Sequence, residues 1–343
     1  MAASPNATES SAEPLLDVRD LSTWFHTRRG IAKAVDGIDF KVDRGQVLCI
    51  VGESGCGKSV TALSIMRLVA PPGRIESGEV RFEGRNLLEL DAAEMTALRG
   101  ERISMIFQDP SSSLNPVAQI GLQISEVYEL HRAARRKAGL DAATDMLTKV
   151  GIPDPARRAK SYPHEMSGGM AQRVMIAMAL ACEPRLLIAD EPTTALDVTI
   201  QAQILDLMRS LQDESGMAII LITHDLGVVG EMADRVAVMY AGEIVEEADV
   251  ATLFSEPKHP YTRSLLDSIP VLGQTRDTLA VIPGTVPNLV NLPRGCRFAS
   301  RCRARIEHKL EICTEQKPDL IELDTGHGGG HRVRCWLYDE APA

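Results

Sequence analysis

Short apolar runs alternate with longer segments of helical periodicity along most of the chain. The runs VLCIVG (47–52), LLIAD (186–190) and AIILIT (218–223) are typical of strands buried on both faces of a parallel sheet. Segments 59–70 and 198–214 instead have apolar residues at helical spacing. This alternation predicts an α/β fold with a mainly parallel sheet.

Three parts of the chain depart from this pattern. LLDVRDLSTWF (15–25) and KAVDGIDFKVDRGQ (33–46) predict antiparallel strands, with turns at Asp36-Gly37 and Arg44-Gly45. Residues 123–152 are almost wholly helical and predict an inserted helical subdomain. Beyond about residue 255 the chain is rich in Pro, Gly and Cys, which predicts a separate small module.

Composition and charge narrow the class of protein. The net charge of −10 argues against a general nucleic-acid binder, which would usually be basic. No apolar segment approaches the roughly 18 residues of a membrane span, and the polar start of the chain lacks the apolar core of a secretory signal. We therefore expect a cytoplasmic protein whose seven cysteines are reduced thiols or metal ligands.

The strongest chemical signal is GESGCGKS (52–59), which lies between a predicted strand and a predicted helix. It fits the phosphate-binding pattern G-x-x-x-x-G-K-[ST] in the context that this pattern requires. The glycines let backbone N–H groups face phosphate oxygens, Lys58 reaches the β- and γ-phosphates, and the Ser59 hydroxyl binds Mg²⁺. The alternative, a glycine-rich turn with an incidental lysine, does not account for this context.

A second signal is the pair of acids that ends the run LLIADE. Asp190 follows a buried strand and is expected near the Mg²⁺ ion. The adjacent Glu191, which is not a metal ligand, can act as general base toward an attacking water. Two acids at a strand end are more often a solvated edge, but the phosphate-binding loop upstream favours the functional interpretation.

Five ordered motifs resemble those of ATP-binding-cassette (ABC) ATPases. MSGGMAQRV (166–174) and LLIADEPTTALD (186–197) resemble the signature sequence, Walker B motif and D-loop of that family, while Gln108 and His224 match its Q-loop and switch histidine. The resemblance covers residues 16 to about 250. It implies a P-loop NTPase fold with an antiparallel β subdomain and a helical insertion, and it implies ATP hydrolysis with Mg²⁺.

The resemblance also implies roles for individual residues. Two cassettes pair head to tail, so Ser167 and Gly169 contact the γ-phosphate bound by the partner. Glu191 activates water, His224 holds the γ-phosphate, and Gln108 senses Mg²⁺ and water. The expected nucleotide-binding residues are Phe25, Gly52, Glu53, Ser54, Gly55, Cys56, Gly57, Lys58, Ser59, Val60, Ser167, Gly168, Gly169 and Asp197, and the expected Mg²⁺ residues are Ser59, Gln108 and Asp190. Phe25 is the candidate for stacking on adenine, with Trp24 as the alternative.

Three further stretches resemble one subfamily, the ATPase subunits of the dipeptide/oligopeptide (peptide/nickel) importers. They are FQDPSSSLNP (107–116), the segment from 167 to 205, and KHPYTRSLL (258–266). The resemblance implies a second ATPase subunit, two permeases, a substrate-binding protein and a peripheral location on the cytoplasmic face of the inner membrane. Nickel, glutathione or cationic peptides are alternative cargoes. A soluble ABC ATPase acting on nucleic acid or ribosomes is the alternative class.

Four cysteines, Cys296, Cys302, Cys313 and Cys335, fall in the last fifty residues. In a reducing compartment they suggest tetrathiolate coordination of zinc or an iron–sulfur cluster. The short cysteine pairs common in zinc sites are absent, and resemblance to the importer ATPases implies a [4Fe–4S] cluster; zinc or no metal are the alternatives. We expect Arg297, Arg301, Arg303 and Arg334 to offset the cluster charge and to donate hydrogen bonds to sulfur.

The predicted organisation has three parts, the second of which contains a subdomain. They are a disordered tail at 1–15, an ATPase domain at 16–257 containing a helical subdomain at about 110–170, and a C-terminal module at 258–343 that holds the four-cysteine site.

Overall fold

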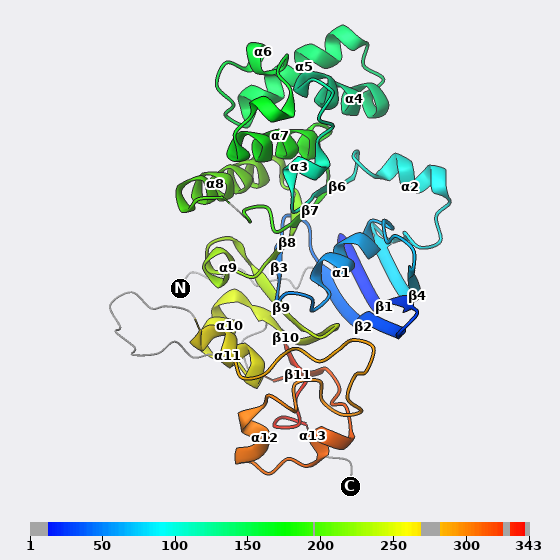
Figure 1. The fold of residues 1–343 in the computed structure, drawn as a ribbon, viewed down its shortest axis with the longest axis vertical. Helices are drawn as coiled ribbons and strands as arrows, with labels where there is room; N and C mark the ends of the chain where they lie inside the picture. Colours follow the sequence, from blue (N-terminus) through cyan, green and yellow to red (C-terminus); the bar gives the residue numbers. More distant parts are fainter. Residues whose placement is uncertain (1–12, 195, 269–281, 325–329, 340–343) are drawn as a thin grey trace, which may run out of the picture.

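A computed structural model describes residues 13–194, 196–268, 282–324 and 330–339, so most of the predicted tail lies outside the described residues. The molecule is elongated, with a group of helices at one end, a β-rich middle and the cysteine-containing segment at the other end (Figure 1). Among the described residues, no helix is both long and apolar enough to span a bilayer.

An eight-stranded sheet forms the centre of the molecule, in the order β11-β12-β10-β9-β3-β8-β7-β6. Its strands are β3 (Val47–Val51), β6 (Ile103–Ile106), β7 (Leu186–Asp190), β8 (Ala218–Thr223), β9 (Arg235–Tyr240), β10 (Glu243–Asp249), β11 (Ile321–Leu323) and β12 (His331–Val333). The strands from β6 to β9 pair in parallel, whereas β9, β10, β12 and β11 pair antiparallel. The three apolar runs of the sequence are therefore central parallel strands, as predicted.

The sheet is buried on both faces, which explains the unbroken apolar runs. Alternate side chains of β3 point to opposite faces: Val47, Cys49 and Val51 join one hydrophobic core, and Leu48 and Ile50 join the other. The first core includes residues of the helical insertion and the second includes residues of the antiparallel sheet. Both units are thus packed onto the strand that leads into the phosphate-binding loop.

A four-stranded antiparallel sheet, in the order β2-β1-β4-β5, packs beside the central one. Its strands are β1 (Leu16–Thr27), β2 (Gly30–Val42), β4 (Gly73–Phe82) and β5 (Arg85–Asn86). The turn predicted at Asp36-Gly37 is wrong, because both residues lie inside β2 and the chain reverses between Thr27 and Gly30. Gly37 has φ +70° at a register shift and donates its N–H to Ser22 Oγ, so this Asp-Gly pair accompanies an irregularity within the strand.

Helices cover the central sheet and form the insertion. They are α1 (Lys58–Ile65), α2 (Ala92–Leu98), α3 (Pro110–Ser113), α4 (Ile120–Arg132), α5 (Arg136–Lys149), α6 (Pro155–Arg158), the 3₁₀ helix η1 (Pro163–Glu165), α7 (Gly168–Leu180), α8 (Val198–Ser215), α9 (Leu226–Met232), α10 (Val250–Ser255), α11 (Pro260–Asp267), α12 (Arg303–Glu307) and α13 (Ile312–Glu315). Helix α1 is shorter than the predicted 59–70, since Arg67 has φ +51° and two prolines follow at 71 and 72.

The C-terminal segment is continuous with the cassette, which the sequence did not indicate. Strand β12 pairs with β10, so β12 and β11 extend the central sheet. The buried Glu246 of β10 accepts hydrogen bonds from the backbone N–H groups of Lys258 and His259 and contacts Nε2 of the buried His331 of β12 at 2.8 Å. A single carboxylate thus joins β10, the start of α11 and β12.

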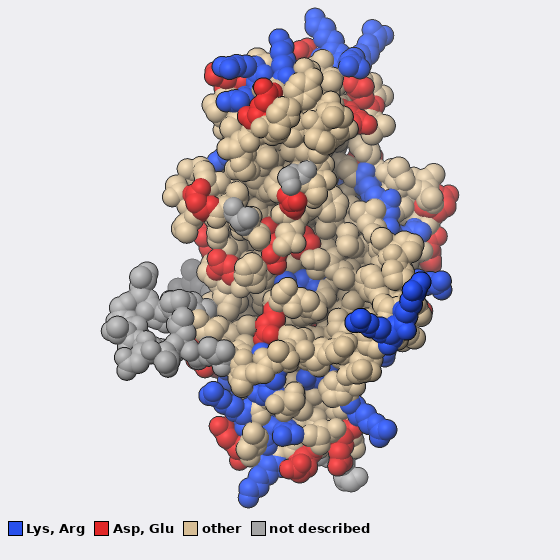
Figure 2. Space-filling model, viewed as in Figure 1, with Lys and Arg blue, Asp and Glu red and all other residues tan. Residues whose placement is uncertain are grey.

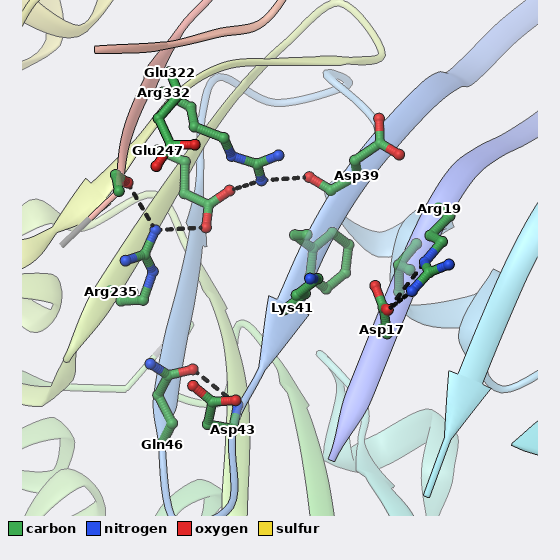
Figure 3. A pocket seen from close by; sticks show the side chains of 13 residues that line it. Asp17, Arg19, Asp39, Lys41, Asp43, Gln46, Arg235, Glu247, Glu322 and Arg332 are labelled. Carbon is green, nitrogen blue, oxygen red and sulfur yellow. Dashed lines mark hydrogen bonds and ion pairs between the residues drawn. The ribbon is translucent and has the colours of Figure 1, made fainter. Parts of the chain in front are cut away.

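A polar cavity of about 570 Å³ lies along this junction (Figure 3). Arg332 of β12 reaches both Glu247 of β10 and, at 2.8 Å, the Asp39 carbonyl of β2, while Arg235 of β9 donates to Glu247 at 2.9 Å. Its arginines are therefore engaged with groups of the protein itself. The charged side chains that line the cavity connect the two sheets and the C-terminal segment.

Charged side chains are unevenly spread over the surface. Basic residues gather at the end formed by α4–α6 and again over the C-terminal segment, and acidic residues are concentrated across the middle of the visible face (Figure 2). On this face, acidic side chains also lie among the basic ones at both ends.

The buried His259 predicts how stability depends on pH. Its Nδ1 accepts the Tyr261 N–H at 3.0 Å as the N-cap of α11, and burial lowers its pKa to about 4. Between the ordinary value near 6.5 and about 4, the unfolded chain takes up a proton that the folded chain does not, so stability falls as pH falls. We expect the shifted pKa of His259 to lower the free energy of unfolding by about 2 kcal/mol as the pH falls from about 7.5 to about 5.

Urea unfolding at several pH values measures this effect. His259→Asn keeps a capping acceptor but cannot titrate, so its free energy of unfolding should change less over this range than that of the parent chain. His308→Asn, at an exposed position, is the matched control and should leave the slope unchanged. Equal slopes for the parent chain and His259→Asn would contradict the assignment.

Candidate nucleotide-binding and hydrolysis site

The segment Gly52–Ser59 forms the loop between β3 and α1 and the first two residues of α1, where a phosphate-binding loop is expected. Gly52 has φ +154° and Gly57 has φ +112°, which side-chain-bearing residues rarely adopt. A Cβ at Gly52 would lie 2.1 Å from the Met239 carbonyl oxygen, and one at Gly57 would lie 2.2 Å from the Ala34 carbonyl oxygen. The loop is therefore pressed between β2 and β9, and only glycine fits at these two positions.

Lys58 lies under the loop and is 5% exposed. Its ammonium donates to the carbonyl oxygens of Gly52 at 2.7 Å and Glu53 at 3.2 Å. These contacts hold the cation at the position where phosphate oxygens would meet the loop. The third N–H of the ammonium reaches only Cys56 Sγ, at 3.9 Å, and is the one that can turn to a phosphate oxygen.

The two predicted Mg²⁺ residues Ser59 and Asp190 meet directly. Ser59 Oγ donates to Asp190 Oδ1 at 3.0 Å, joining the first turn of α1 to the end of β7. Burial raises the pKa of Asp190, whereas the Ser59 hydroxyl opposes that rise. A hydroxyl and a buried carboxylate are hard oxygen donors of the kind Mg²⁺ takes, so this pair fits the ion.

Glu191 is surrounded by three side chains. Its Oε2 accepts hydrogen bonds from Gln108 Nε2 at 3.0 Å and Thr194 Oγ1 at 2.9 Å, and its Oε1 lies 3.3 Å from Nδ1 of His224. Its backbone has φ +47°, in the left-handed region, and its N–H donates to the Ile222 carbonyl of β8. A strained backbone at a residue whose side chain contacts several polar groups is typical of functional sites.

Three members of this group, Gln108, Glu191 and His224, are predicted from the sequence, whereas Thr194 is not. Gln108 follows β6, Glu191 follows β7 and His224 follows β8, so neighbouring parallel strands deliver them to one edge of the sheet. Thr194 lies three residues after Glu191 and folds back onto it in a turn. In the sequence, only the position of Thr194 within the stretch EPTTALD pointed to a place in this group.

The signature and D-loop residues lie apart from this group on the surface. Ser167 caps α7, accepting the Met170 N–H at 3.3 Å, and Asp197 caps α8, accepting the Ile200 N–H at 3.0 Å. Both residues are exposed, and Val198 beside Asp197 is 84% exposed. Two helix N-termini are thus presented outward, where their N–H groups favour an anion.

The two aromatic candidates have different surroundings. Trp24 Nε1 donates to Asp36 Oδ1 at 3.2 Å, and its ring lies under the Lys33 ammonium at 4.4 Å. The Phe25 ring lies against Gly73, where a Cβ would come within 2.7 Å of it, and remains partly exposed. Phe25 stays the predicted adenine contact, because Trp24 is already engaged by charged partners.

The four C-terminal cysteines are neighbours. Burial, with the adjacent thiols of Cys313, Cys335 and Cys302, raises the pKa of Cys296 to about 12. The Cys296 N–H donates to the Cys313 carbonyl at 2.8 Å, and a Cβ at Gly295 would lie 2.2 Å from that carbonyl. Three remote parts of the chain are thereby brought to one place.

The donors around sulfur differ from those predicted. The Arg305 backbone N–H donates to Cys302 Sγ at 3.4 Å, but the guanidinium groups of Arg297, Arg301 and Arg334 bond carbonyl, carboxylate or hydroxyl oxygens. The prediction that these three arginines donate to sulfur is wrong, because buried oxygens on the cassette take their N–H groups. Arg303 is exposed.

Four thiols with backbone N–H groups near sulfur have the donor chemistry of an iron–sulfur group, but their placement does not form a binding geometry. Within the described residues, no set of three or more His, Cys, Asp or Glu side chains is placed to hold a metal ion. The other three cysteines, Cys49, Cys56 and Cys182, are buried in the cassette. Cys56 is fully buried in the phosphate-binding loop, and burial raises its pKa, so it acts as a packing residue.

A mainly apolar groove of about 580 Å³ lies on the helical side of the cassette. Its lining comes from the end of α1, from β6 and the segment after it, and from α4 and α7. Phe107, Leu68 and Leu130 are exposed there, Leu130 to 72%. A groove with exposed large apolar side chains is typical of a docking surface.

Known proteins resemble this chain over nearly its whole length. Residues 35–194 match the ABC transporter family, and residues 245–313 match the oligopeptide/dipeptide transporter C-terminal region. The probable peptide ABC transporter ATP-binding protein y4tR of Sinorhizobium fredii is 54% identical, with 96% of each chain covered. The oligopeptide transport ATP-binding protein OppD of Bacillus subtilis is 51% identical over 96% of this chain and 90% of its own length.

Solved structures of ABC cassettes also resemble the cassette part of this chain. The dimeric ATP-binding cassette MJ0796, bound to ADP and Pi in a post-hydrolysis state, is 27% identical with a TM-score of 0.62, covering 68% of this chain and 98% of that one. The cbiO1 subunit of the cbiONQ ABC transporter complex from Clostridium perfringens is 28% identical with a TM-score of 0.61, covering 71% and 92%. The α/β cassette fold predicted from the motifs is confirmed.

Two glycine substitutions test the close packing of the phosphate-binding loop. Gly57→Ala must displace either the loop or the Ala34 carbonyl and should weaken ATP binding at least about tenfold. Gly55→Ala is the matched control: its φ of +79° is also unfavourable, but its Cβ would meet nothing within 4 Å. Calorimetric titration with ATP should show a much smaller loss for Gly55→Ala. Equal losses would mean that the Ala34 contact does not shape the site.

Proposed function

The chain belongs to the ATP-binding subunits of the ABC transporter family and hydrolyses ATP, and on this premise we propose that it powers the import of di- and oligopeptides. The proposal of peptide cargo rests on relatives that are about half identical along almost the whole chain. The match of residues 245–313 to the oligopeptide/dipeptide transporter C-terminal region supports it. Nickel, glutathione or cationic peptides would use the same ATP chemistry, because the nucleotide site does not contact the cargo.

One observation carries the hydrolytic assignment. Glu191 sits next in the chain to Asp190, the partner of Ser59, and has Gln108, Thr194 and His224 around its carboxylate. We assign Glu191 as the general base because a carboxylate held at such a position can take a proton from water. Ser59, Asp190 and Gln108 would hold Mg²⁺, which offsets phosphate charge when bound.

The other residues act on the phosphate chain. Lys58 contacts the β- and γ-phosphates with the N–H that its loop carbonyls do not use, and backbone N–H groups of residues 53–60 surround them. His224 is exposed beside Glu191 and can turn to hold the γ-phosphate. The water oxygen bonds to the γ-phosphorus as the bond from that phosphorus to the β–γ bridging oxygen breaks. ADP leaves with the bridging oxygen, inorganic phosphate is formed, and Glu191 receives the water proton.

We propose that the active form is a head-to-tail pair with a second ATPase subunit. The exposed N-termini of α7 and α8 support this, since they present Ser167, Gly168, Gly169 and Asp197 at the surface, where a second subunit can reach them. The 84% exposure of Val198 also favours a covered surface in the assembly. Closure around ATP then shifts the permeases, and hydrolysis reopens the pair.

The apolar groove beside Phe107 and Leu130 is our proposed docking surface for a membrane permease. The chain would thus be held peripherally on the cytoplasmic face of the inner membrane by two permeases, with a binding protein supplying cargo. The proposed division follows: an ATPase domain at 16–257, its helical subdomain at about 110–170, and a C-terminal module at 258–343.

Removing the carboxylate of Glu191 tests the proposed function. In the complex of both ATPase subunits and both permeases, hydrolysis should rise when a peptide-loaded binding protein is added. Glu191→Gln should lower the hydrolysis rate at its own composite site by at least about 100-fold and leave ATP binding intact. Glu214→Gln, at an exposed residue of α8, is the control and should behave as the parent. Full peptide-stimulated activity in Glu191→Gln would overturn the assignment.

We also propose that Cys296, Cys302, Cys313 and Cys335 hold a [4Fe–4S] cluster. The mutual proximity of the thiols and the N–H donation to Cys302 support it. Burial raises the pKa of Cys335 to about 12, so its thiol is neutral at physiological pH unless a cationic group binds the thiolate. The cluster would supply that positive charge.

Anaerobic purification tests the cluster. We expect a brown protein with about four irons and four sulfides per chain. Cys313→Ser should lose the colour and the iron, whereas Cys182→Ser, at a buried cysteine of the cassette, should keep both. A colourless parent protein with stoichiometric zinc would contradict the proposal.

A further inference from the structure

We propose that the C-terminal module positions the phosphate-binding loop, with Arg301 and Tyr261 acting on Glu53 of that loop. The inference goes beyond ATP binding by the loop itself, because it assigns part of the ATP affinity to residues 248 and 208 positions away in the chain. It rests on the proposed nucleotide site but not on the identity of the group held by the cysteines.

Glu53 is fixed at both its backbone and its side chain. Its N–H donates to the Tyr261 hydroxyl at 2.9 Å, and its Oε2 accepts from Arg301 Nη1 at 3.0 Å. Glu53 is the second residue of the loop, and its carbonyl also holds the Lys58 ammonium. A shift of Glu53 would therefore move both the backbone of the loop and the resting place of its lysine.

Arg301 is itself held rigidly. Its side chain is 5% exposed, its Nε donates to the Pro283 carbonyl at 2.7 Å, and its Nη1 also lies 3.2 Å from the Tyr240 hydroxyl. A buried guanidinium requires a compensating carboxylate, and Glu53 is the carboxylate within reach. The pair is thus a fixed contact of the fold and not an exchangeable surface ion pair.

Tyr261 reaches the loop from a packed aromatic group. The ring centroids of Tyr240, Tyr261 and Phe298 lie 4.6 to 5.4 Å apart in tilted and edge-on arrangements. Tyr261 and Phe298 are almost fully buried, and both belong to the main hydrophobic core. The motif KHPYTRSLL therefore has a structural role: its tyrosine orients an N–H of the phosphate-binding loop.

A second route joins the same module to the loop. Arg297 donates to the Ala241 carbonyl and pairs with Asp36 of β2. The next residue, Gly242, donates its N–H to the Cys56 carbonyl of the loop at 2.8 Å. Arg297 thus holds the turn between β9 and β10 that contacts the loop from the other side.

Arg297, Phe298 and Arg301 all lie between Cys296 and Cys302. Both ends of this short segment belong to the four-cysteine site, and its long side chains point into the cassette. Whatever the cysteines hold will fix the two ends of the segment that supports the loop. Loss or exchange of the group that the cysteines hold should therefore change the affinity for ATP.

Loss of the contact between Arg301 and Glu53 should weaken ATP binding more than it slows hydrolysis. Glu191, Gln108 and His224 are held by β6, β7 and β8, on the other side of β3 from β9 and the module. Loss of the Arg301 contact should raise the KM for MgATP about tenfold, the value of one charge-assisted hydrogen bond. The kcat should stay within about twofold, since the general base is undisturbed.

The test compares Arg301→Gln, Glu53→Ala and the double variant in the full-length chain and in the assembled complex. The dissociation constant of a non-hydrolysable ATP analogue is measured by calorimetry, and KM and kcat by phosphate release. If the contact positions the loop, the double variant should bind no more weakly than the weaker single variant. Arg303→Gln, at an exposed arginine beside Cys302, is the matched control and should bind as the parent does.

Two further variants separate positioning from loss of folding. Tyr261→Phe removes one oxygen from the packed group and should weaken binding by a few-fold with unchanged thermal stability of the nucleotide-free chain. Cys302→Ser should weaken ATP binding in the parent by a larger factor than in Arg301→Gln, where only the route through Arg297 remains. Independent, multiplicative effects of Cys302→Ser and Arg301→Gln on affinity would overturn the inference.

The outcomes also separate this inference from the proposed nucleotide site. Lys58→Ala must abolish binding of the analogue if the loop is the phosphate site. Loss of binding in Lys58→Ala with parental affinity in Arg301→Gln would overturn the positioning role alone. Retained binding in Lys58→Ala would overturn the nucleotide site, and the inference with it.

Discussion

The close approach of the phosphate-binding loop to its two neighbouring strands is the constraint on which the rest of the structure depends. Gly52 lies against the Met239 carbonyl of β9, and Gly57 lies against the Ala34 carbonyl of β2. Because backbone meets backbone at both places, the loop cannot move without β2 or β9. Its glycines therefore serve two purposes: they turn N–H groups toward phosphate, and they join the two sheets at the site.

This constraint explains why the C-terminal segment belongs with the ATP site. Strand β9 pairs with β10, β10 pairs with β12, and the segment between Cys296 and Cys302 holds the turn between β9 and β10. The buried carboxylates Glu243, Glu246 and Glu247 of β10 bind groups that come from this segment and from β12. Removing one partner of such a pair leaves a buried charge uncompensated, so the cassette and the C-terminal segment stabilise each other.

The site is asymmetric in a way that fits a paired assembly. Lys58, Ser59, Asp190 and Glu191, the groups proposed to contact phosphate, Mg²⁺ and water, are buried or half-buried near the ends of neighbouring parallel strands. The groups of the signature and D-loop are instead exposed at the starts of α7 and α8. In the head-to-tail pair proposed above, both sets would meet around one ATP, and nucleotide state would then be linked to the separation of the subunits.

The sequence by itself determined the local chemistry. The pattern from Gly52 to Ser59, the acids at 190 and 191 and the apolar strands follow from short-range spacing, because one strand, one loop and one helix suffice to specify them. Tertiary structure alone decided the partners of Glu53. Arg301 and Tyr261 lie 248 and 208 residues away in sequence, and no local periodicity encodes such contacts. The same holds for the three arginines near the cysteines, whose buried oxygen partners on the cassette exist only once the sheets have packed.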